Sequence, residues 1–325
     1  MEPIPFSGVV SLYEDGRELE TRCALFADIP NKRPNGPATV FGMASGCKIF
    51  TAAAILELAE EGALALDSPA DTLLGGGAVD PAVTVRQLLT HTSGVPDYFD
   101  EQEMDDYETL WKERPSYSMR RPDDFLPLFA GRPGKFPPGS RFAYSNSGFV
   151  LLACIIERIT RTPFPDFVRE RVLNPCGMAR SGYYRLDMPP PDAAIGYIAE
   201  GQSFRSNVYS IPIIGGGDGG CYTNGADMDR FWRALAGGGL IGPGLAADML
   251  SVHVADTGDE KDRYGLGVWI DERDDDLVFI QGFDPGVRFL SYCHRESGRT
   301  LTVCANVECR LGPIVAEYKP KLARG

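Results

Sequence analysis

A serine and a lysine three residues apart, Ser45 and Lys48, stand at the start of a long apolar segment, residues 49–58. Residues with this spacing lie on one face of a helix, so the hydroxyl and the amine can share a proton. The free N–H groups at a helix start favour a developing anion, and a desolvated lysine more readily gives up its charge. The pair therefore predicts a nucleophilic serine with an amine as proton acceptor.

An isolated Ser-x-x-Lys is more often a helix-capping serine followed by a lysine on the surface. The residues after Lys48 favour the chemical interpretation, because a helix that is apolar on all sides is buried and has little room for an idle charge.

A second polar group, Tyr144-Ser145-Asn146, precedes another apolar segment, residues 147–156. A tyrosine beside a lysine ammonium can act as a general base or proton shuttle, and an asparagine amide can hold both a lysine and a substrate carbonyl. Taken alone, these three residues are more often part of an ordinary turn than of a catalytic site.

Together these segments resemble the serine β-lactamase and penicillin-binding-protein-like superfamily, in particular its branch of class C β-lactamases, D,D-peptidases and esterases. The resemblance implies that Ser45 is the acylated nucleophile, Lys48 its proton acceptor, and Tyr144 the base that helps activate Ser45 and protonates the leaving group. Asn146 would orient the lysine and bind substrate. Further matching segments follow in the expected order: LLTHTSGVPDY, FPPGSRFAYSNSGF, LNPCGM, GGCYTNGADMDRF and YGLGVWI.

The resemblance also implies a third motif, a Lys or His followed by Thr or Ser and Gly, on a strand near residues 281–289. If Gly282 begins this motif, Phe283 replaces the cation, Asp284 the hydroxyl and Pro285 the glycine. The cation and the hydroxyl hold the substrate carboxylate in β-lactam and D-Ala-D-Ala recognition, so Phe283 and Asp284 are expected to line a substrate site that does not favour a carboxylate. Arg288 could restore the charge only by turning into the cleft.

The oxyanion hole needs backbone N–H groups rather than particular side chains. In the family one donor is the nucleophile and the other is the residue after the third motif, which corresponds here to Ser45 and Gly286. The catalytic half of the site is therefore expected to be retained, while carboxylate recognition is altered.

Other polar residues near these motifs have weaker signals. His91 is expected to be structural, and Cys47 is expected to pack in the core. Asp218, within the glycine-rich segment 215–222, could meet a substrate amine. Three aromatic residues of the helical region are candidates to line the part of the cleft that receives the leaving group: Tyr98, Trp111 and Tyr117.

The order of predicted elements favours an α/β (α+β) class with a β-lactamase/transpeptidase-like fold: an antiparallel sheet flanked by helices, with an inserted, mostly helical domain. Alternating segments on both sides of Asp15-Gly16 predict a hairpin. A helix is expected from Ser45 to Glu61, and strands are expected within 264–307. We expect one discontinuous domain, 1–66 and 193–325, a helical domain, 67–192, and the active site in the cleft between them. The short chain after residue 307 leaves little for a terminal helix.

The chain has 325 residues and a formal net charge of −13, so nucleic acids and anionic membranes are poor partners. It shows neither a secretory signal nor an 18-residue apolar run, which predicts a cytoplasmic protein. The eight cysteines are expected to be reduced and mostly buried, with no metal and no cofactor. No feature indicates an oligomeric state.

The expected function is hydrolysis of a small ester or amide through an acyl-enzyme on Ser45, with carboxylesterase activity favoured because it needs no carboxylate recognition. The alternatives are a β-lactamase, D,D-peptidase or D-aminopeptidase with altered recognition, and a catalytically silent binding protein.

Overall fold

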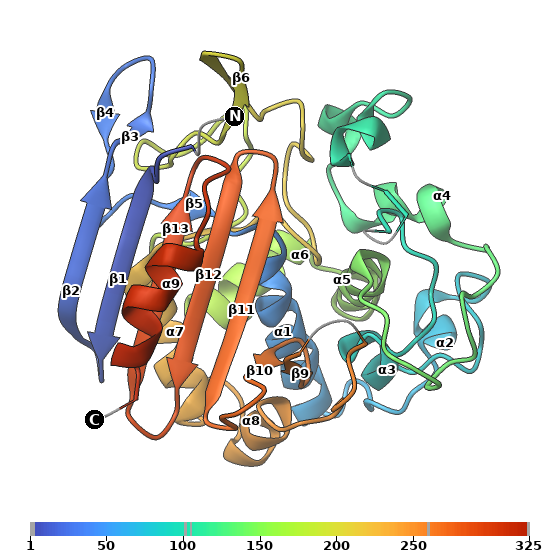
Figure 1. Cartoon of the computed structure of the whole chain (residues 1–325). Coiled ribbons are helices and arrows are strands. Elements are labelled where there is room, and N and C mark those ends of the chain that lie inside the picture. Colours follow the sequence, from blue (N-terminus) through green and yellow to red (C-terminus); the bar gives the residue numbers. More distant parts are fainter. Residues whose placement is uncertain (1–3, 101–102, 105, 259–260, 324–325) are drawn as a thin grey trace.

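A seven-stranded antiparallel sheet forms the centre of the molecule, shown in Figure 1 as a computed structural model. The structure describes residues 4–323 except 101–102, 105 and 259–260. The strand order is β2-β1-β13-β12-β11-β10-β9, so the first strands of the chain pair with the last. The α/β fold class with a large antiparallel sheet is confirmed. The strands are β1 (Gly8–Glu14), β2 (Arg17–Ala24), β9 (Arg263–Tyr264), β10 (Trp269–Ile270), β11 (Leu277–Asp284), β12 (Val287–His294) and β13 (Arg299–Ala305).

The predicted hairpin at Asp15-Gly16 joins β1 to β2. Both turn residues have positive φ, 50° for Asp15 and 84° for Gly16. Positive φ at both central positions matches the twist of the flanking strands, which explains the Asp-Gly pair.

Apolar side chains alternate between the two faces of the sheet. On one face Val278, Ile280 and Phe289 join the core that contains the long helices. On the other face Leu277 and Phe279 join a smaller core covered by α9 (Gly312–Tyr318). A short terminal helix thus covers the outer face of the sheet, as Figure 1 shows.

The segment that carries Ser45 differs slightly from the expected single helix. A 3-10 turn, η1 (Ala44–Cys47), comes first, and α1 (Lys48–Glu60) follows it. All residues of α1 from 48 to 56 are buried, as the uninterrupted apolar pattern predicted. Gly62 follows the helix with φ of 75°, a conformation that suits glycine.

Polar caps fix the starts of the other main helices. Ser145 caps α5 (Asn146–Thr160), Asn224 caps α7 (Gly225–Ala236), and Thr84 caps α3 (Val85–Leu89). Each of these side chains accepts a backbone N–H that has no partner within its helix.

Short elements complete the chain, and the described residues between 67 and 192 contain no named strand. No helix in the described part combines the length and apolarity needed to cross a bilayer. All eight cysteines are free thiols and seven are buried. The remaining elements are β3 (Phe26–Asp28), β4 (Arg33–Pro34), β5 (Phe41–Gly42), α2 (Ala70–Leu74), η2 (Tyr107–Trp111), η3 (Ser116–Ser118), η4 (Pro122–Phe125), α4 (Leu126–Phe129), α6 (Phe164–Val168), η5 (Arg169–Leu173), β6 (Tyr197–Glu200), β7 (Ser203–Ser206), β8 (Tyr222–Thr223), α8 (Pro243–Met249) and η6 (Lys319–Lys321).

Candidate active site

Ser45 lies on the 3-10 turn at the entrance to α1. The preceding residue, Ala44, has φ of 45°, a left-handed conformation that costs energy for a residue with a side chain. In a 3-10 helix, side chains three residues apart eclipse each other, which aligns Ser45 with Lys48. The Lys48 Nζ lies 3.0 Å from the Ser45 Oγ.

Lys48 is held at three points. Besides Ser45, its Nζ donates to the Oδ1 of Asn146 at 2.9 Å and to the backbone oxygen of Asp218 at 2.6 Å. A lysine ammonium has three hydrogens, so all of them are engaged. The residue is only 3% exposed, and these contacts leave the amine little freedom to turn away from the serine.

Tyr144 lies beside this pair. The Lys48 Nζ is 5.0 Å from the centroid of the Tyr144 ring. The Tyr144 ring also packs against the His91 ring, with centroids 4.4 Å apart. The structure therefore brings the serine, the lysine and the tyrosine together, although residue 144 is about one hundred positions away in the sequence.

His91 is buried behind Tyr144, and its contacts agree with a structural role. Its Nδ1 accepts the backbone N–H of Ser145 at 3.1 Å, which leaves the hydrogen on Nε2, 3.1 Å from the Tyr264 hydroxyl. Burial, with a smaller contribution from Lys48, lowers the pKa of His91 well below 6.5. The neutral ring holds the start of α5 and supports the Tyr144 ring.

The depressed pKa of His91 predicts a loss of stability in acid. Below about pH 6.5 the unfolded chain binds a proton at His91 that the folded protein does not, so stability falls as the pH drops. The slope from this one group is at most about 1.4 kcal/mol per pH unit. His91→Asn keeps an acceptor for Ser145 and tolerates the positive φ. Between about pH 7.5 and pH 5.5, the free energy of unfolding measured with urea should fall less for this variant than for the wild type. Equal decreases in the two proteins would contradict the lowered pKa of His91.

Asp97 positions Asn146, and the sequence reasoning did not single it out. Its carboxylate accepts the backbone N–H groups of Asn146 at 2.8 Å and Ser147 at 3.0 Å, together with the Asn146 side-chain amide at 3.3 Å. Burial raises the pKa of Asp97 to about 6, partly offset by these bonds. With the amide nitrogen engaged, the Asn146 oxygen faces Lys48. Asp97 lies within LLTHTSGVPDY, one of the segments that carry the family resemblance. Only the fold shows that its carboxylate reaches the start of α5.

The glycine-rich segment 215–220 packs tightly between α1 and α5. Thr51 donates to the Gly217 oxygen at 2.6 Å, and Lys48 donates to the Asp218 oxygen. A Cβ at Gly217 would lie 2.3 Å from the Phe149 oxygen, so only glycine allows this approach. The segment thus brings Asp218 next to the lysine.

A chain of buried polar groups surrounds the Asp218 carboxylate. The Tyr98 hydroxyl donates to the Asp218 Oδ2 and lies 3.2 Å from the Tyr107 hydroxyl. Burial raises the pKa of Asp218, and the Lys48 charge and the Tyr98 hydrogen bond oppose that shift. Of the aromatic residues suggested from the sequence, Tyr98 lines the cleft, Trp111 is buried against the Ser210 oxygen, and Tyr117 is exposed.

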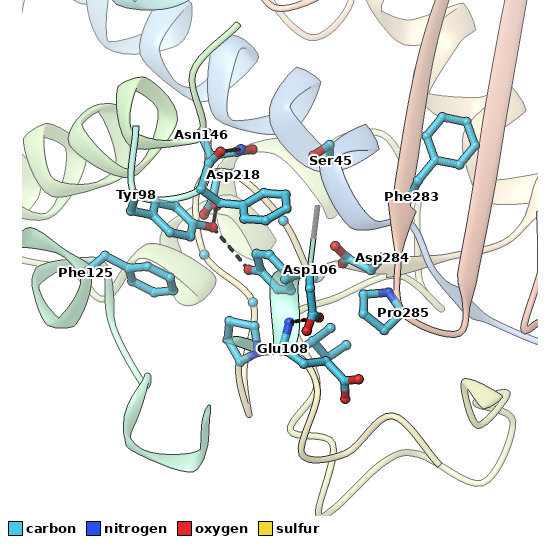
Figure 2. Close-up of a pocket in the computed structure, with 18 of the residues that line it drawn as sticks. Ser45, Tyr98, Asp106, Glu108, Phe125, Asn146, Asp218, Phe283, Asp284 and Pro285 are labelled. Atoms are coloured by element: carbon cyan, nitrogen blue, oxygen red, sulfur yellow. Dashed lines mark hydrogen bonds between the residues drawn. The ribbon is translucent and has the colours of Figure 1, made fainter. Parts of the chain in front are cut away.

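Ser45 opens onto a cleft of about 420 Å³, a size suited to a small molecule. Figure 2 shows Asp106, Glu108 and Asp284 below Ser45, and Tyr98, Asn146 and Asp218 to its left. Its walls include parts of η1, residues 98–99 and 106–108, the glycine-rich segment and the end of β11. The lining residues are Ser45, Tyr98, Phe99, Asp106, Tyr107, Glu108, Phe125, Asn146, Ile198, Ile211, Pro212, Gly215, Gly216, Asp218, Gly219, Gly220, Phe283, Asp284, Pro285, Arg288 and Glu308.

The end of β11 contacts the turn that carries Ser45 through Gly282. A Cβ at Gly282 would lie 2.7 Å from the backbone nitrogen of Ser45, so Gly282 is the glycine that packs against the serine. Gly286 lies in the β11–β12 turn with φ of 71°, and its Cβ would meet Gly196 and Tyr197 instead. We therefore propose a register of the third motif that is shifted by three residues from the predicted one, with Gly282 instead of Pro285 at its glycine position.

The side chains at this hairpin do not recreate the missing cation. Phe283 is 52% exposed, and the Arg288 guanidinium lies 5.6 Å from its ring centroid. Arg288 Nη1 donates to the backbone oxygens of Asp284 and Val287, and its Nη2 lies 3.8 Å from Glu308. Arg288 thus lines the cleft with its charge turned toward its own hairpin and an acidic neighbour.

A family model, known sequences and solved structures all include proteins that are similar to this chain. A family model described as Beta-lactamase matches residues 6–307. Penicillin-binding protein 4* of Bacillus subtilis (strain 168) is 29% identical over 93% of this chain and 68% of its own length. A solved penicillin binding protein from Bacillus halodurans is 41% identical, with a TM-score of 0.93 over 97% of both chains. A D-stereospecific amidohydrolase from Streptomyces sp. is 26% identical, with a TM-score of 0.77 over 93% of this chain and 90% of that one.

Proposed function

Because this chain belongs to the Beta-lactamase family, we propose that it is a serine hydrolase that cleaves an ester or amide through an acyl-enzyme on Ser45. The observation that carries this proposal is the buried Lys48 amine, which lies 3.0 Å from the Ser45 Oγ where Ser45 lines the cleft. We assign that cleft to the junction of a sheet domain, 1–66 and 193–325, with a helical domain, 67–192.

The reaction proceeds in two acyl-transfer steps. The Ser45 Oγ attacks the substrate carbonyl carbon, and its proton passes to the neighbouring base, Lys48 in its neutral form or the Tyr144 phenolate. The tetrahedral intermediate collapses, the bond to the leaving group breaks, and Tyr144 returns the proton to the departing oxygen or nitrogen. Water then attacks the acyl-enzyme with the same groups acting in reverse, which releases the acid and restores Ser45.

The oxyanion hole is formed by the backbone N–H groups of Ser45 and Phe283. The Leu277 oxygen accepts the Asp271 N–H on the β10 side of β11. Backbone groups alternate along an antiparallel strand, so Phe283 faces the same edge, beyond the end of β10. Phe283 also directly follows the glycine that contacts Ser45, and it replaces Gly286 in this role.

The shifted register supports ester hydrolysis over carboxylate-dependent activities. With Gly282 as the motif glycine, Ile280 takes the place of the cation and Gln281 the place of the hydroxyl. Ile280 is buried and apolar, so it offers nothing to an anionic group. A carboxylesterase-type activity is therefore favoured over a β-lactamase or D,D-peptidase activity, whose substrates carry a carboxylate.

Comparison of two chromogenic substrates tests this choice. We expect measurable hydrolysis of p-nitrophenyl acetate and a lower kcat/KM for nitrocefin, which carries a carboxylate. A hydrogen bond to a charged group contributes about 1.5–3 kcal/mol, so its absence lowers kcat/KM about 10- to 150-fold relative to an enzyme that has it. Nitrocefin turnover above that of the ester would overturn the esterase assignment.

A structure of the enzyme after reaction with a fluorophosphonate tests the site directly. The phosphoryl oxygen should accept from the N–H groups of Ser45 and Phe283. An adduct oxygen bound at Gly286 would contradict the shifted register, and the lack of any adduct on Ser45 in folded protein would favour a silent binding protein.

A further inference from the structure

We propose that Arg205 determines the selectivity of this cleft, because it fixes one of the cleft walls and thereby favours esters with an apolar extension of several carbons. The inference rests on the proposed function and deepens it, since it names a positioning residue and the class of substrate that the wall selects. Arg205 lies on β7, outside the segments that carry the family resemblance.

The guanidinium of Arg205 joins three segments of the chain. Its Nη2 donates to both carboxylate oxygens of Glu108 on η2, at 2.8 and 2.7 Å. Its Nη1 donates to the Ser210 Oγ at 2.8 Å, and its Nε donates to the Glu200 carboxylate at 2.6 Å. An isolated surface ion pair contributes little to stability, whereas a network that engages all three nitrogens holds its partners in one geometry.

Further contacts close this clamp, which we define as Arg205, Glu108 and Ser210. The Ser210 side chain is buried, and its hydroxyl donates to the Glu108 carboxylate. The backbone oxygen of Ser210 accepts from the Trp111 Nε1 at 2.9 Å, which holds η2 at a second point. Burial raises the pKa of Glu108, but the hydrogen bonds from Ser210 and Arg205 outweigh this effect and leave the pKa below its ordinary value. Glu108 is therefore charged at neutral pH, and its charge is paired.

The clamp holds one wall of the cleft. Four lining residues form this clamped wall: Tyr107, Glu108, Ile198 and Ile211. Ile198 lies directly opposite Arg205 in the β6–β7 pair, and Ile211 follows Ser210 in the chain. Each residue of the clamped wall is therefore a member of the clamp or a direct neighbour of one. Loss of the clamp would displace the apolar surface that a substrate contacts.

The Tyr107 ring extends the same constraint to the aromatic side chains beside it. It packs edge-on against Trp111 and Phe99, with centroids 5.3 and 4.9 Å apart. Its hydroxyl lies 3.2 Å from the Tyr98 hydroxyl. An apolar surface that is already held in place binds a substrate at a smaller cost in conformational entropy than a mobile surface does.

The clamped wall suits a part of the substrate away from the scissile bond. Figure 2 shows Ser45 near the top of the labelled side chains and Glu108 near the bottom. Because Arg205 pairs with Glu108, an apolar group beside this carboxylate does not leave an unpaired charge out of water. Each methylene that leaves water for such a wall strengthens binding by a similar factor. An ester with a longer apolar chain should therefore react with a higher kcat/KM than a short one.

The test measures kcat/KM for two pairs of esters. The first pair, p-nitrophenyl hexanoate and p-nitrophenyl acetate, differs in the acyl group, and the second pair, hexyl acetate and ethyl acetate, differs in the alcohol. The wild type should prefer the longer ester of at least one pair. In Arg205→Met that preference should fall about fourfold or more, the factor expected when contact with one buried methylene is lost. A wild type without a preference in either pair, or a preference that survives in Arg205→Met, overturns the inference.

Two further variants assign the effect to the clamp. Glu108→Gln removes the charge at the other end of the ion pair and should also lower the preference; if Arg205→Met does not fold, this variant decides. The double variant should lose little more than the larger single loss, because both substitutions break one contact, and additive losses would overturn the inference.

Arg185→Met is the matched control, because Arg185 also donates two hydrogen bonds to a carboxylate, that of Asp187, at an exposed site. The preference should not change in this variant, and an equal fall would show a general effect of charge and overturn the inference. An enzyme that is labelled at Ser45 but keeps its preference in Arg205→Met removes only this inference. Wild-type protein that neither hydrolyses an ester nor is labelled at Ser45 removes the proposed function, and this inference with it.

Discussion

Replacement of Ser45 by alanine is expected to lower kcat for p-nitrophenyl acetate by about 10³-fold or more, because the acyl-enzyme cannot form without the Oγ. The Lys48 amine loses one acceptor and keeps those from Asn146 and Asp218. The truncated side chain also leaves the start of α1 unchanged, since Ser45 does not act as a helix cap. The variant should therefore stay folded while losing activity.

Intact-mass measurement after treatment with a fluorophosphonate gives a second readout. The wild type should gain one adduct, and Ser45→Ala should gain none. Ser118→Ala, which removes an exposed hydroxyl, is the matched control and should behave as wild type. Hydrolysis by Ser45→Ala at the wild-type rate would show that another group is the nucleophile.

Replacement of Lys48 by methionine is expected to lower kcat by about 10²- to 10⁴-fold, the range of general acid–base catalysis. Methionine keeps most of the side-chain length but cannot exchange a proton with Ser45. The oxygens of Asn146 and Asp218 lose their donor, at about 1–3 kcal/mol for each unsatisfied buried acceptor. Because the variant also no longer buries an ammonium, part of this cost is offset and a folded protein is expected.

Kinetics of acylation, followed by burst or single-turnover measurement, should place the defect of Lys48→Met in the chemical step. Circular dichroism and urea unfolding should show a native fold. Lys112→Met, at an exposed site, serves as the control for loss of one lysine. A Lys48→Met enzyme that acylates at the wild-type rate would contradict proton transfer through this amine and would leave Tyr144 as the remaining base.

Interactions within short segments were predictable because the residues involved are neighbours in sequence. The Asp15-Gly16 hairpin depends on turn conformation, and the buried helix after Lys48 depends on the apolar pattern of its residues. The spacing of Ser45 and Lys48 likewise puts them on one face whether the first turn is α-helical or 3-10. The same local rules could not show that the turn is 3-10 or that Ala44 has positive φ.

The third motif shows the limit of sequence reasoning. Its cation and hydroxyl are absent, so the sequence alone allows several registers of the segment 280–286. The register that we propose depends on a contact across the fold, where Gly282 meets the backbone of Ser45. The residues of this segment do not by themselves indicate which of them contacts Ser45.

The sequence by itself determined the α/β class and the polar groups at the two helix starts, because backbone geometry and side-chain periodicity act over a few residues. Tertiary structure alone decided which distant groups meet: Lys48 with Asn146 and Asp218, Asp97 with the start of α5, and the acidic residues around one cleft. These contacts depend on how sheet and helices pack, since each joins segments far apart along the chain. The contact between Ser45 and Lys48 was therefore predictable, whereas the groups that surround this pair were set by the fold.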